Sequence, residues 1–304
     1  MVATKFYETP MGKLLTLYEN QKRVDPITPK HHGLNGQLIV SMTSYAPRFK
    51  WLHLTIKSLL EQTIIPDALV LWIAEEELNL LPDSVRALSK KIVIEPTKNL
   101  YSYKKIIPAL RAYHQAHIVI CDDDIYYPRG WLEGLVCGFG NFKRAVFAHS
   151  VHRFHYSPSG QIAPYYDWSF DVQDNKARQR SFDTLAVGVG GVLYPHGSLH
   201  PDVTDESLFT SLCPGGDDLW LYVMARLNGF LPVKVGNRLH PIFWPGTQSV
   251  GLFKENMYKN DDIAIAKLMA HYGKEIFNPA VDVEDGKQGA GSEVSLRFHA
   301  GTPS

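Results

Sequence analysis

HIVICDDDIYYP, residues 117–128, is the stretch of sequence that decides the fold. An apolar run from Ile118 to Cys121 is followed at once by three aspartates at positions 122–124. Short apolar runs rich in β-branched residues and closed by polar residues are typical of buried strands. We therefore expect a strand that ends where the acids begin.

Alternating strand-like and helix-like segments precede this stretch. QLIVSMT (37–43), ALVLWIA (68–74) and KIVIEP (91–96) are apolar and strand-like. Between them, WLHLTIKSLLEQ (51–62) and PDSVRALSKK (82–91) have the spacing of helices. This order predicts an α/β fold with a mainly parallel sheet flanked by helices, in which ligands bind beyond the carboxyl ends of the strands.

The second half of the chain is less regular. YYDWSF (165–170) is aromatic, and TLAVGVGGVLYP (184–195) is apolar and rich in glycine. GGDDLWLYVMARLNG (215–229) has apolar residues at helical spacing, so we expect Asp217 and Asp218 to open a helix. Acids are also favourable at a helix N-terminus for electrostatic reasons alone, which is the alternative interpretation of this pair.

These patterns divide the chain into three parts. Residues 1–36 are polar and rich in proline, and we expect an irregular lead-in that includes His31 and His32. Residues 37–278 form the predicted domain, which divides into a regular first half at 37–127 and a less regular second half at 128–278. Residues 279–304 are rich in glycine and serine and predict a flexible tail.

Composition excludes several classes of protein. Thirty-one Lys and Arg balance 31 Asp and Glu, so the general positive charge of a nucleic-acid-binding protein is missing. Three cysteines without C-x-x-C spacing argue against a disulfide framework or a structural zinc site. No run approaches the roughly 20 apolar residues of a transmembrane helix. We expect a cytoplasmic protein, with peripheral membrane association as an open alternative.

The three aspartates suggest a metal site. Like charges in succession are unfavourable unless a cation neutralises them, and carboxylate oxygens are good ligands for Mg²⁺ or Mn²⁺. In an extended segment Asp122 and Asp124 would share one face and Asp123 would point elsewhere. The other interpretation is a solvated acidic turn.

The motifs together resemble nucleotide-sugar glycosyltransferases of the GT-A fold, most closely the family 2 group that includes enzymes of bacterial surface-polysaccharide assembly. CDDDIYYP resembles the D-x-D motif of that fold, GGVLYP its acceptor-side glycine segment, and GGDDLWL its E-D motif. The resemblance covers roughly Gln37 to Asp262, and it implies that residues 37–127 are the nucleotide-binding half of the domain and residues 128–278 its acceptor half. Asp217 departs from the glutamate usual in the E-D motif.

The resemblance implies roles for the acids. Asp124 would hold Mn²⁺ or Mg²⁺ between the two phosphates of a sugar nucleotide, and Asp122 would contact the ribose or the water shell of the metal. His240 would supply a third metal ligand. Asp218, beside Asp217, would be the general base that deprotonates the acceptor hydroxyl.

The resemblance also implies donor-binding residues at the strand ends. Besides Asp122 and Asp123, the nucleotide sugar would be bound by Thr43, Ser44, Tyr45, Arg48, Glu75 and Lys105, the last in preference to Lys104. Ordinary turn structure before Pro47 and a lysine on a solvated helix face are the alternatives. Aromatic side chains are expected to support a sugar acceptor, namely Tyr165, Tyr166, Trp168 and Trp244.

The sequence thus predicts a metal-dependent enzyme that moves a sugar from a nucleotide-diphosphate donor to a hydroxyl of a glycan or glycolipid, with inversion at the anomeric carbon. A phosphoryl-transfer or nucleotide-hydrolysing enzyme could use the same acids. A sugar- or nucleotide-binding protein without catalytic activity is the third possibility. The acidic pair at 217–218 and the aromatic second half favour the transferase.

Overall fold

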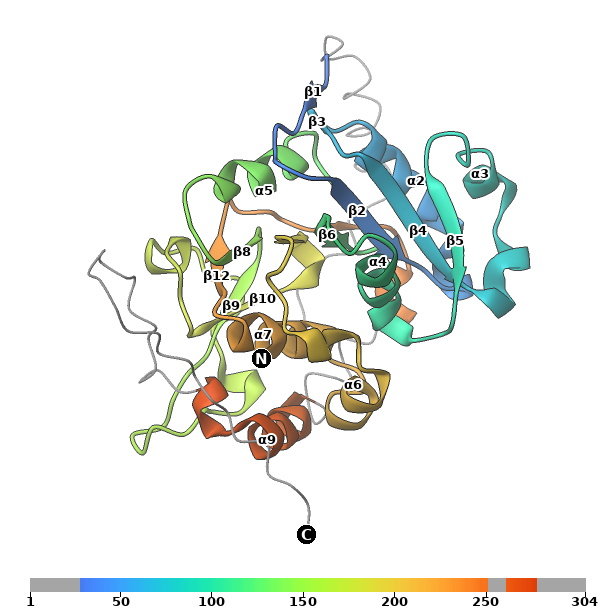
Figure 1. The fold of residues 1–304 in the computed structure, drawn as a ribbon. Coiled ribbons are helices and arrows are strands. Elements are labelled where there is room, and N and C mark those ends of the chain that lie inside the picture. Colours follow the sequence, from blue (N-terminus) through green and yellow to red (C-terminus); the bar gives the residue numbers. More distant parts are fainter. Residues whose placement is uncertain (1–27, 251–260, 278–304) are drawn as a thin grey trace.

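The computed structural model describes residues 28–250 and 261–277. Its centre is a seven-stranded sheet in the order β12-β8-β11-β6-β2-β4-β5. Six of these strands run parallel and β11 runs against its neighbours β6 and β8. Helices flank the sheet (Figure 1), so the fold is the predicted α/β class with a mainly parallel sheet.

The first half supplies one side of this sheet. Its strands are β2 (Leu38–Thr43), β4 (Ala68–Ala74), β5 (Val93–Thr97) and β6 (His117–Cys121), and its helices are α2 (Phe49–Leu60), α3 (Asp83–Arg86) and α4 (Ile107–Ala112). The positions of these strands and of the long helix α2 agree with the prediction from the sequence. The helix expected at 82–91 is shorter, and it follows the 3-10 turn Glu75–Leu80. Helix α4 likewise follows a 3-10 turn, Tyr101–Lys105.

The second half continues the same sheet with β8 (Ala145–Ala148), β11 (Val192–Tyr194) and β12 (Leu231–Lys234). Small two-stranded pairs join β9 (Val151–Arg153) with β10 (Thr184–Ala186) and β7 (Ile125–Tyr126) with β13 (Ile242–Phe243). The helices of this half are α5 (Trp131–Phe139), α6 (Glu206–Leu212), α7 (Asp217–Leu227) and α9 (Asp261–Tyr272). The two predicted halves therefore share one sheet.

Two apolar layers cover the two faces of the sheet because successive strand residues point to opposite sides. On β2, Ile39 belongs to the layer that contains residues of α4, α6, α7 and α9. Leu38, Val40 and Met42 belong to the other layer, with residues of α2, α3 and α5. Figure 1 shows α6, α7 and α9 grouped on one side of the molecule.

The lead-in differs from expectation. Lys30–His31 form β1, a short strand that pairs in parallel with β3 (Ile64–Ile65). His32 is buried behind it. Residues 1–27 and the predicted tail at 279–304 lie outside the described residues.

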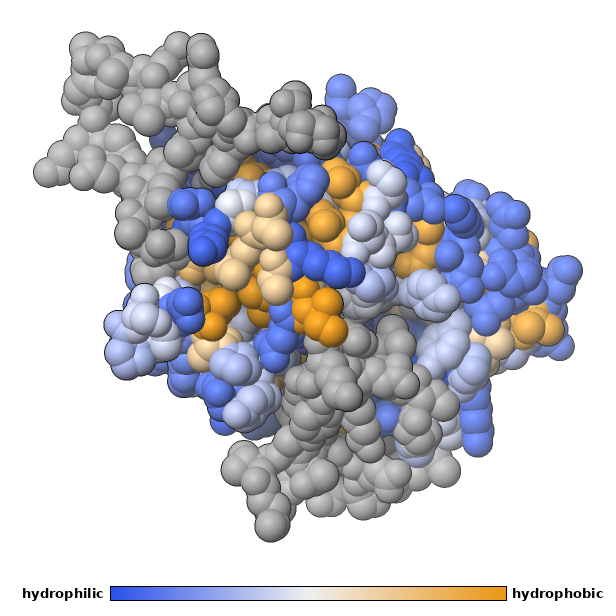
Figure 2. Space-filling view, turned by 90° about the horizontal axis from the view of Figure 1, so that it is seen from below, coloured by the Kyte–Doolittle hydropathy of each residue, from blue (hydrophilic) through white to orange (hydrophobic). Residues whose placement is uncertain are grey.

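The surface seen from below carries its hydrophobic residues in small groups between hydrophilic ones (Figure 2). Single exposed apolar side chains, such as Ile263 on α9, are ordinary features of protein surfaces. Among the described helices, none has the length and apolar character needed to cross a bilayer.

Candidate active site

The carboxyl edge of the sheet brings the predicted site residues together. β2 ends at Thr43 and β6 ends at Cys121, and these two strands are paired. The 3-10 turn Gly188–Gly190 reaches the same edge, because Val192 at the start of β11 pairs with Ile120 near the end of β6. Segments from residue 43 to residue 192 therefore meet at one place.

Asp123 is held by the loop that follows β2. Its carboxylate accepts hydrogen bonds from the Ser44 hydroxyl and from Arg48 Nη1, the latter at 2.7 Å. Thr55 on α2 donates to the Asp123 carbonyl at 2.8 Å. Burial raises the pKa of Asp123 although Arg48 and Ser44 oppose this effect. Asp123 thus fixes the loop after β2 against the acid segment.

Asp124 lies beside Asp123 and is almost completely buried. Gln248 Nε2 donates to its Oδ2 at 2.8 Å, and Arg48 Nη2 lies 3.3 Å from the same oxygen. Burial and repulsion from Asp123 raise the pKa of Asp124 to about 7, against the attraction of Arg48. A further cation near this carboxylate would therefore be favourable.

Asp122 faces a different cation. Its Oδ1 accepts a hydrogen bond from Lys105 Nζ at 3.1 Å, and its backbone N–H donates to the Tyr127 hydroxyl at 2.8 Å. The Asp122 side chain is 27% exposed, against 2% for Asp124. Asp122 is therefore the acid of the triplet that is most accessible to a ligand.

Lys105 connects the acid triplet to helix α7. The same Nζ that contacts Asp122 lies 2.9 Å from Asp217 Oδ2. Burial opposes the positive charge, but the attraction of Asp122, Asp217 and Asp218 outweighs it and raises the pKa of Lys105. The lysine therefore stays protonated at neutral pH and joins the two motifs.

Asp218 lies in the first turn of α7, beside the glycine-rich turn. Its Oδ1 accepts a hydrogen bond from the Gly188 N–H at 3.0 Å. A Cβ at Gly188 would lie 3.0 Å from Lys105 Nζ and 3.2 Å from that oxygen, so only glycine leaves ordinary space here. Burial and repulsion from Asp217 raise the pKa of Asp218 well above its usual value, so its carboxylate is a stronger base than an ordinary aspartate.

The pairing within the triplet corrects the sequence expectation. Asp122 and Asp124 were expected to share a face, whereas Asp123 and Asp124 both contact Arg48 and Asp122 contacts Lys105. The chain bends at 123–124 instead of remaining extended, so the alternation of a strand does not apply. The physical cause is β7, which begins at the next residue and pairs with β13.

The charges at this edge fit a divalent cation. Among the described residues, the five aspartates and Glu77 at this edge lie beside three basic side chains, Arg48, Lys104 and Lys105. The carboxylate oxygens suit Mg²⁺ or Mn²⁺, which are often held by one or two carboxylates together with substrate phosphates. Among the described residues, however, no group of three such ligands within 4.8 Å forms here, so a metal would depend on the substrate for further ligands.

Glu77 and Lys104 are functional candidates that the sequence analysis missed. Glu77 Oε1 accepts a hydrogen bond from the Ala46 N–H at 3.0 Å, and Lys104 Nζ donates to the Ser44 carbonyl at 3.3 Å. Glu75, which was expected here, is exposed. The run of three glutamates after β4 indicated an acid at this place in the fold. Because these residues form the 3-10 turn Glu75–Leu80, it is the third glutamate, Glu77, that contacts the loop after β2.

Several other expected residues have structural roles. The Thr43 hydroxyl donates to the Trp72 carbonyl at 2.7 Å, and the Tyr45 ring lies 5.7 Å from the Arg48 guanidinium. His240 is exposed, and no cluster of three metal-ligand groups in the described chain includes it. Its predicted role as a ligand stays a prediction.

The expected aromatic acceptor surface is mostly core. Tyr165, Trp168 and Trp244 are buried, and only Tyr166 is exposed. Tyr165 and Trp168 pack with ring centroids 4.7 Å apart, and Trp244 Nε1 donates to Thr55 Oγ1 at 2.7 Å. Tyr165, Trp168 and Trp244 therefore pack inside the protein and do not form the sugar-binding surface that was expected.

Comparison with known proteins finds no matching family model and no matching curated protein. Solved structures that align with the chain include a mannosyltransferase from Pyrobaculum calidifontis in complex with GDP-Man and Mn²⁺, at 14% identity and a TM-score of 0.47, covering 85% of this chain and 72% of that one. An inositol-1-phosphate CTP transferase from T. maritima aligns at 11% identity and a TM-score of 0.39, covering 77% and 96%.

A 4-diphosphocytidyl-2C-methyl-D-erythritol synthase from Anaerococcus prevotii aligns at 11% identity and a TM-score of 0.44, covering 70% of this chain and 92% of that one. These solved structures are transferases of nucleotide sugars or of nucleotides. At these identities and TM-scores, none of them assigns an activity to this chain.

Proposed function

We propose that this protein is a metal-dependent glycosyltransferase that moves a sugar from a nucleotide-diphosphate donor to a hydroxyl of a glycan or glycolipid. One observation carries the proposal: Lys105 joins Asp122, behind the strand end of β6, to Asp217, at the start of α7. A donor-binding acid and a second acidic pair thus lie within the reach of one side chain.

The acids divide the work between donor and acceptor. Asp124 would hold Mn²⁺ or Mg²⁺, which supplies positive charge to the leaving diphosphate when bound, and Asp122 would contact the ribose or the water shell of the metal. Lys105 adds a buried positive charge beside Asp122. The Ser44 to Arg48 loop, fixed by Asp123, and Glu77 would position the nucleoside.

Asp218 would act as the general base. It accepts the proton of the acceptor hydroxyl while that oxygen bonds to the anomeric carbon and the bond to the diphosphate oxygen breaks, with the electron pair leaving on the diphosphate. A single displacement of this kind inverts the anomeric centre. The raised pKa of Asp218 supports this role, because a carboxylate of ordinary pKa would be a weak base.

Calorimetric titration with UDP, GDP, CMP and dTDP, with and without Mn²⁺, tests donor binding. We expect one nucleotide to bind tightly only with Mn²⁺, and Asp124→Asn to weaken this binding at least tenfold. Asp83→Asn is the matched control, because Asp83 is an exposed acid in the first turn of α3. Failure of every nucleotide to bind would contradict the proposal.

Turnover measurements on Asp218→Asn test the base. We expect turnover to fall by about 10² to 10⁴, the usual contribution of a general base, with donor binding preserved. Normal turnover in this variant would exclude Asp218 as the base. Donor hydrolysis that no acceptor accelerates would favour the nucleotide-hydrolysing alternative, and binding without any turnover would favour the binding protein.

A further inference from the structure

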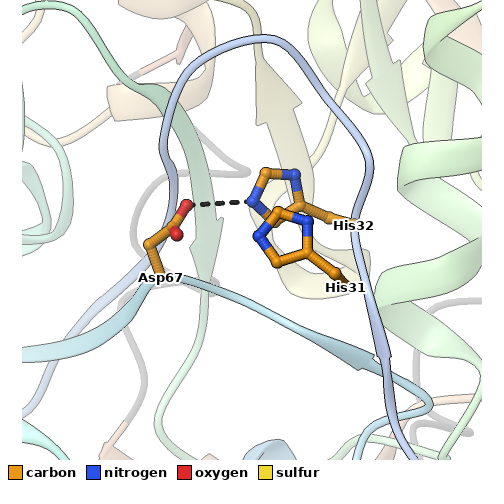
Figure 3. Close-up of side chains that lie close together, drawn as sticks. All are labelled: His31, His32 and Asp67. Carbon is orange, nitrogen blue, oxygen red and sulfur yellow. Dashed lines mark hydrogen bonds and ion pairs between the residues drawn. The ribbon is translucent and has the colours of Figure 1, made fainter.

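A second cluster of ligand-type side chains lies at the opposite, amino edge of the sheet. It consists of His31 on β1, His32 directly after it, and Asp67 between β3 and β4 (Figure 3). The candidate ligand atoms of these three residues all lie within 4.8 Å of one another. In the described part of the chain this is the only such group.

The cluster is anchored to the sheet on its aspartate side. Asp67 Oδ2 accepts hydrogen bonds from the Leu38 N–H at the start of β2, at 2.7 Å, and from His32 Nε2, at 2.9 Å. Burial opposes the charge of Asp67, but these two hydrogen bonds outweigh burial and lower its pKa. Asp67 is therefore an ionised carboxylate, held in place at neutral pH.

The two imidazole rings lie against each other. Their centroids are 4.2 Å apart with an interplanar angle of 31°, and Figure 3 shows both rings on the same side of the Asp67 carboxylate. His31 is exposed, so its side chain can adjust, whereas His32 is buried. Ligand atoms around a tetrahedral zinc ion lie about 3.3 Å apart, given bonds of about 2.0–2.1 Å. The His32 to Asp67 separation is already near this value.

We propose that His31, His32 and Asp67 form a binding site for a divalent transition metal ion of the Zn²⁺ class. Two imidazole nitrogens and one carboxylate oxygen are ligands that suit Zn²⁺ better than Mg²⁺ or Ca²⁺. Water would complete the coordination. Metal binding displaces the proton from His32 Nε2, and the neutral ring then carries that proton on Nδ1.

Metal binding at the Nε2 atoms has a cost that limits the affinity. The Gly33 N–H donates to His31 Nδ1 at 3.2 Å, and the Leu34 N–H donates to His32 Nδ1 at 3.1 Å. A neutral ring that binds metal through Nε2 carries its proton on Nδ1, so both contacts must break. Each is a long hydrogen bond worth about 1 kcal/mol, so we expect reversible binding and not the very tight binding of a zinc finger.

The site would tie the lead-in to the domain. β1 has only two residues and pairs with β3, which is equally short. A metal bound to His31, His32 and Asp67 would cross-link the two segments at the start of β2. This metal site is separate from the candidate active site. The two lie at opposite ends of β2, whose six residues span about 20 Å.

Zinc titration against a chromophoric chelator tests the site. The measurement is made in excess Mg²⁺, which occupies the oxygen-ligand site at the carboxyl edge. We expect one Zn²⁺ per chain and at least tenfold weaker binding in His31→Gln. This variant keeps the buried contacts of His32 and Asp67, so folding is preserved. His114→Gln is the control, since His114 is equally exposed on another surface.

A second measurement separates metal binding from loss of fold. Zn²⁺ should raise the melting temperature of the wild-type protein and of His114→Gln but not of His31→Gln. His31→Cys, which supplies a thiolate, should restore the zinc effect. Equal zinc affinity in His31→Gln and wild type, or no zinc binding by the wild-type protein, would overturn the proposal.

Discussion

At the scale of single residues, the carboxylates of this protein differ because their surroundings differ. Asp122, Asp123 and Asp124 are consecutive, yet the first is partly exposed beside Lys105 and the other two are buried beside Arg48. Burial raises the pKa of both buried acids, and the pKa of Asp124 reaches about 7. Neighbouring residues of one type therefore carry different chemistry.

Asp261 at the start of α9 gives a pH-dependent stability. Burial, with repulsion from Asp262 and Asp217, raises its pKa to about 7 from an ordinary value near 3.8. The folded state therefore binds more protons than the unfolded state between these pH values, and stability falls as the pH rises through this window. We expect Asp261→Asn to be more stable than wild type at pH 8, by on the order of 3 kcal/mol.

The measurement is urea unfolding of both proteins at pH 4 and pH 8. The difference in unfolding free energy should be small at pH 4, where Asp261 is protonated in the folded state, and large at pH 8. Some slope remains in the variant because Asp124 also has a raised pKa. An equal difference at both pH values would contradict the assignment.

At the scale of elements, the glycine turn before β11 sets the distance between α7 and Lys105. The backbone of Gly188 is not in the left-handed region, so alanine causes no backbone strain there. The added methyl group would act only by crowding Lys105 and Asp218. We expect Gly188→Ala to separate Lys105 from Asp218 and to lower turnover at least tenfold, because small displacements of catalytic groups are costly.

The melting temperature of Gly188→Ala should change by only a few degrees, since Lys105 can shift its flexible end. Gly140→Ala is the matched control, because a Cβ there meets nothing within 4 Å. Unchanged turnover in Gly188→Ala would mean that the spacing between α7 and Lys105 is unimportant for the reaction.

At the scale of the whole molecule, the two halves of the chain share one sheet, and we expect them to unfold as one cooperative unit. Strands β8, β11 and β12 extend the sheet formed by β2, β4, β5 and β6, and the candidate site draws on both sets. A ligand that binds only the folded state should therefore stabilise the entire domain.

We expect the binding nucleotide, with Mn²⁺ and at about 100 times its Kd, to add about 2.7 kcal/mol of stability. This corresponds to a rise of about 5 to 10 °C in a single melting transition. Calorimetry with and without EDTA checks the role of the metal. Two separate transitions, of which only one responds to the ligand, would contradict the single-unit interpretation.

Part of the architecture was determined by the sequence itself. The apolar runs of β2, β4 and β6, the acids behind β6 and the helix that begins at Asp217 were all predicted, because each depends on periodicity within a few residues. The resulting expectation, a site at the carboxyl edge of a mainly parallel sheet, follows from chain order alone.

The tertiary structure decided which side chains meet. Gln248 reaches Asp124 across 124 residues of sequence, Glu77 binds the Ala46 N–H, and Trp244 is buried against Thr55. Hydrogen bonds and ion pairs form only at contact distances of a few ångströms, and these distances depend on how separate elements pack. A sequence pattern fixes the type of each side chain near an edge, whereas only packing fixes its partner.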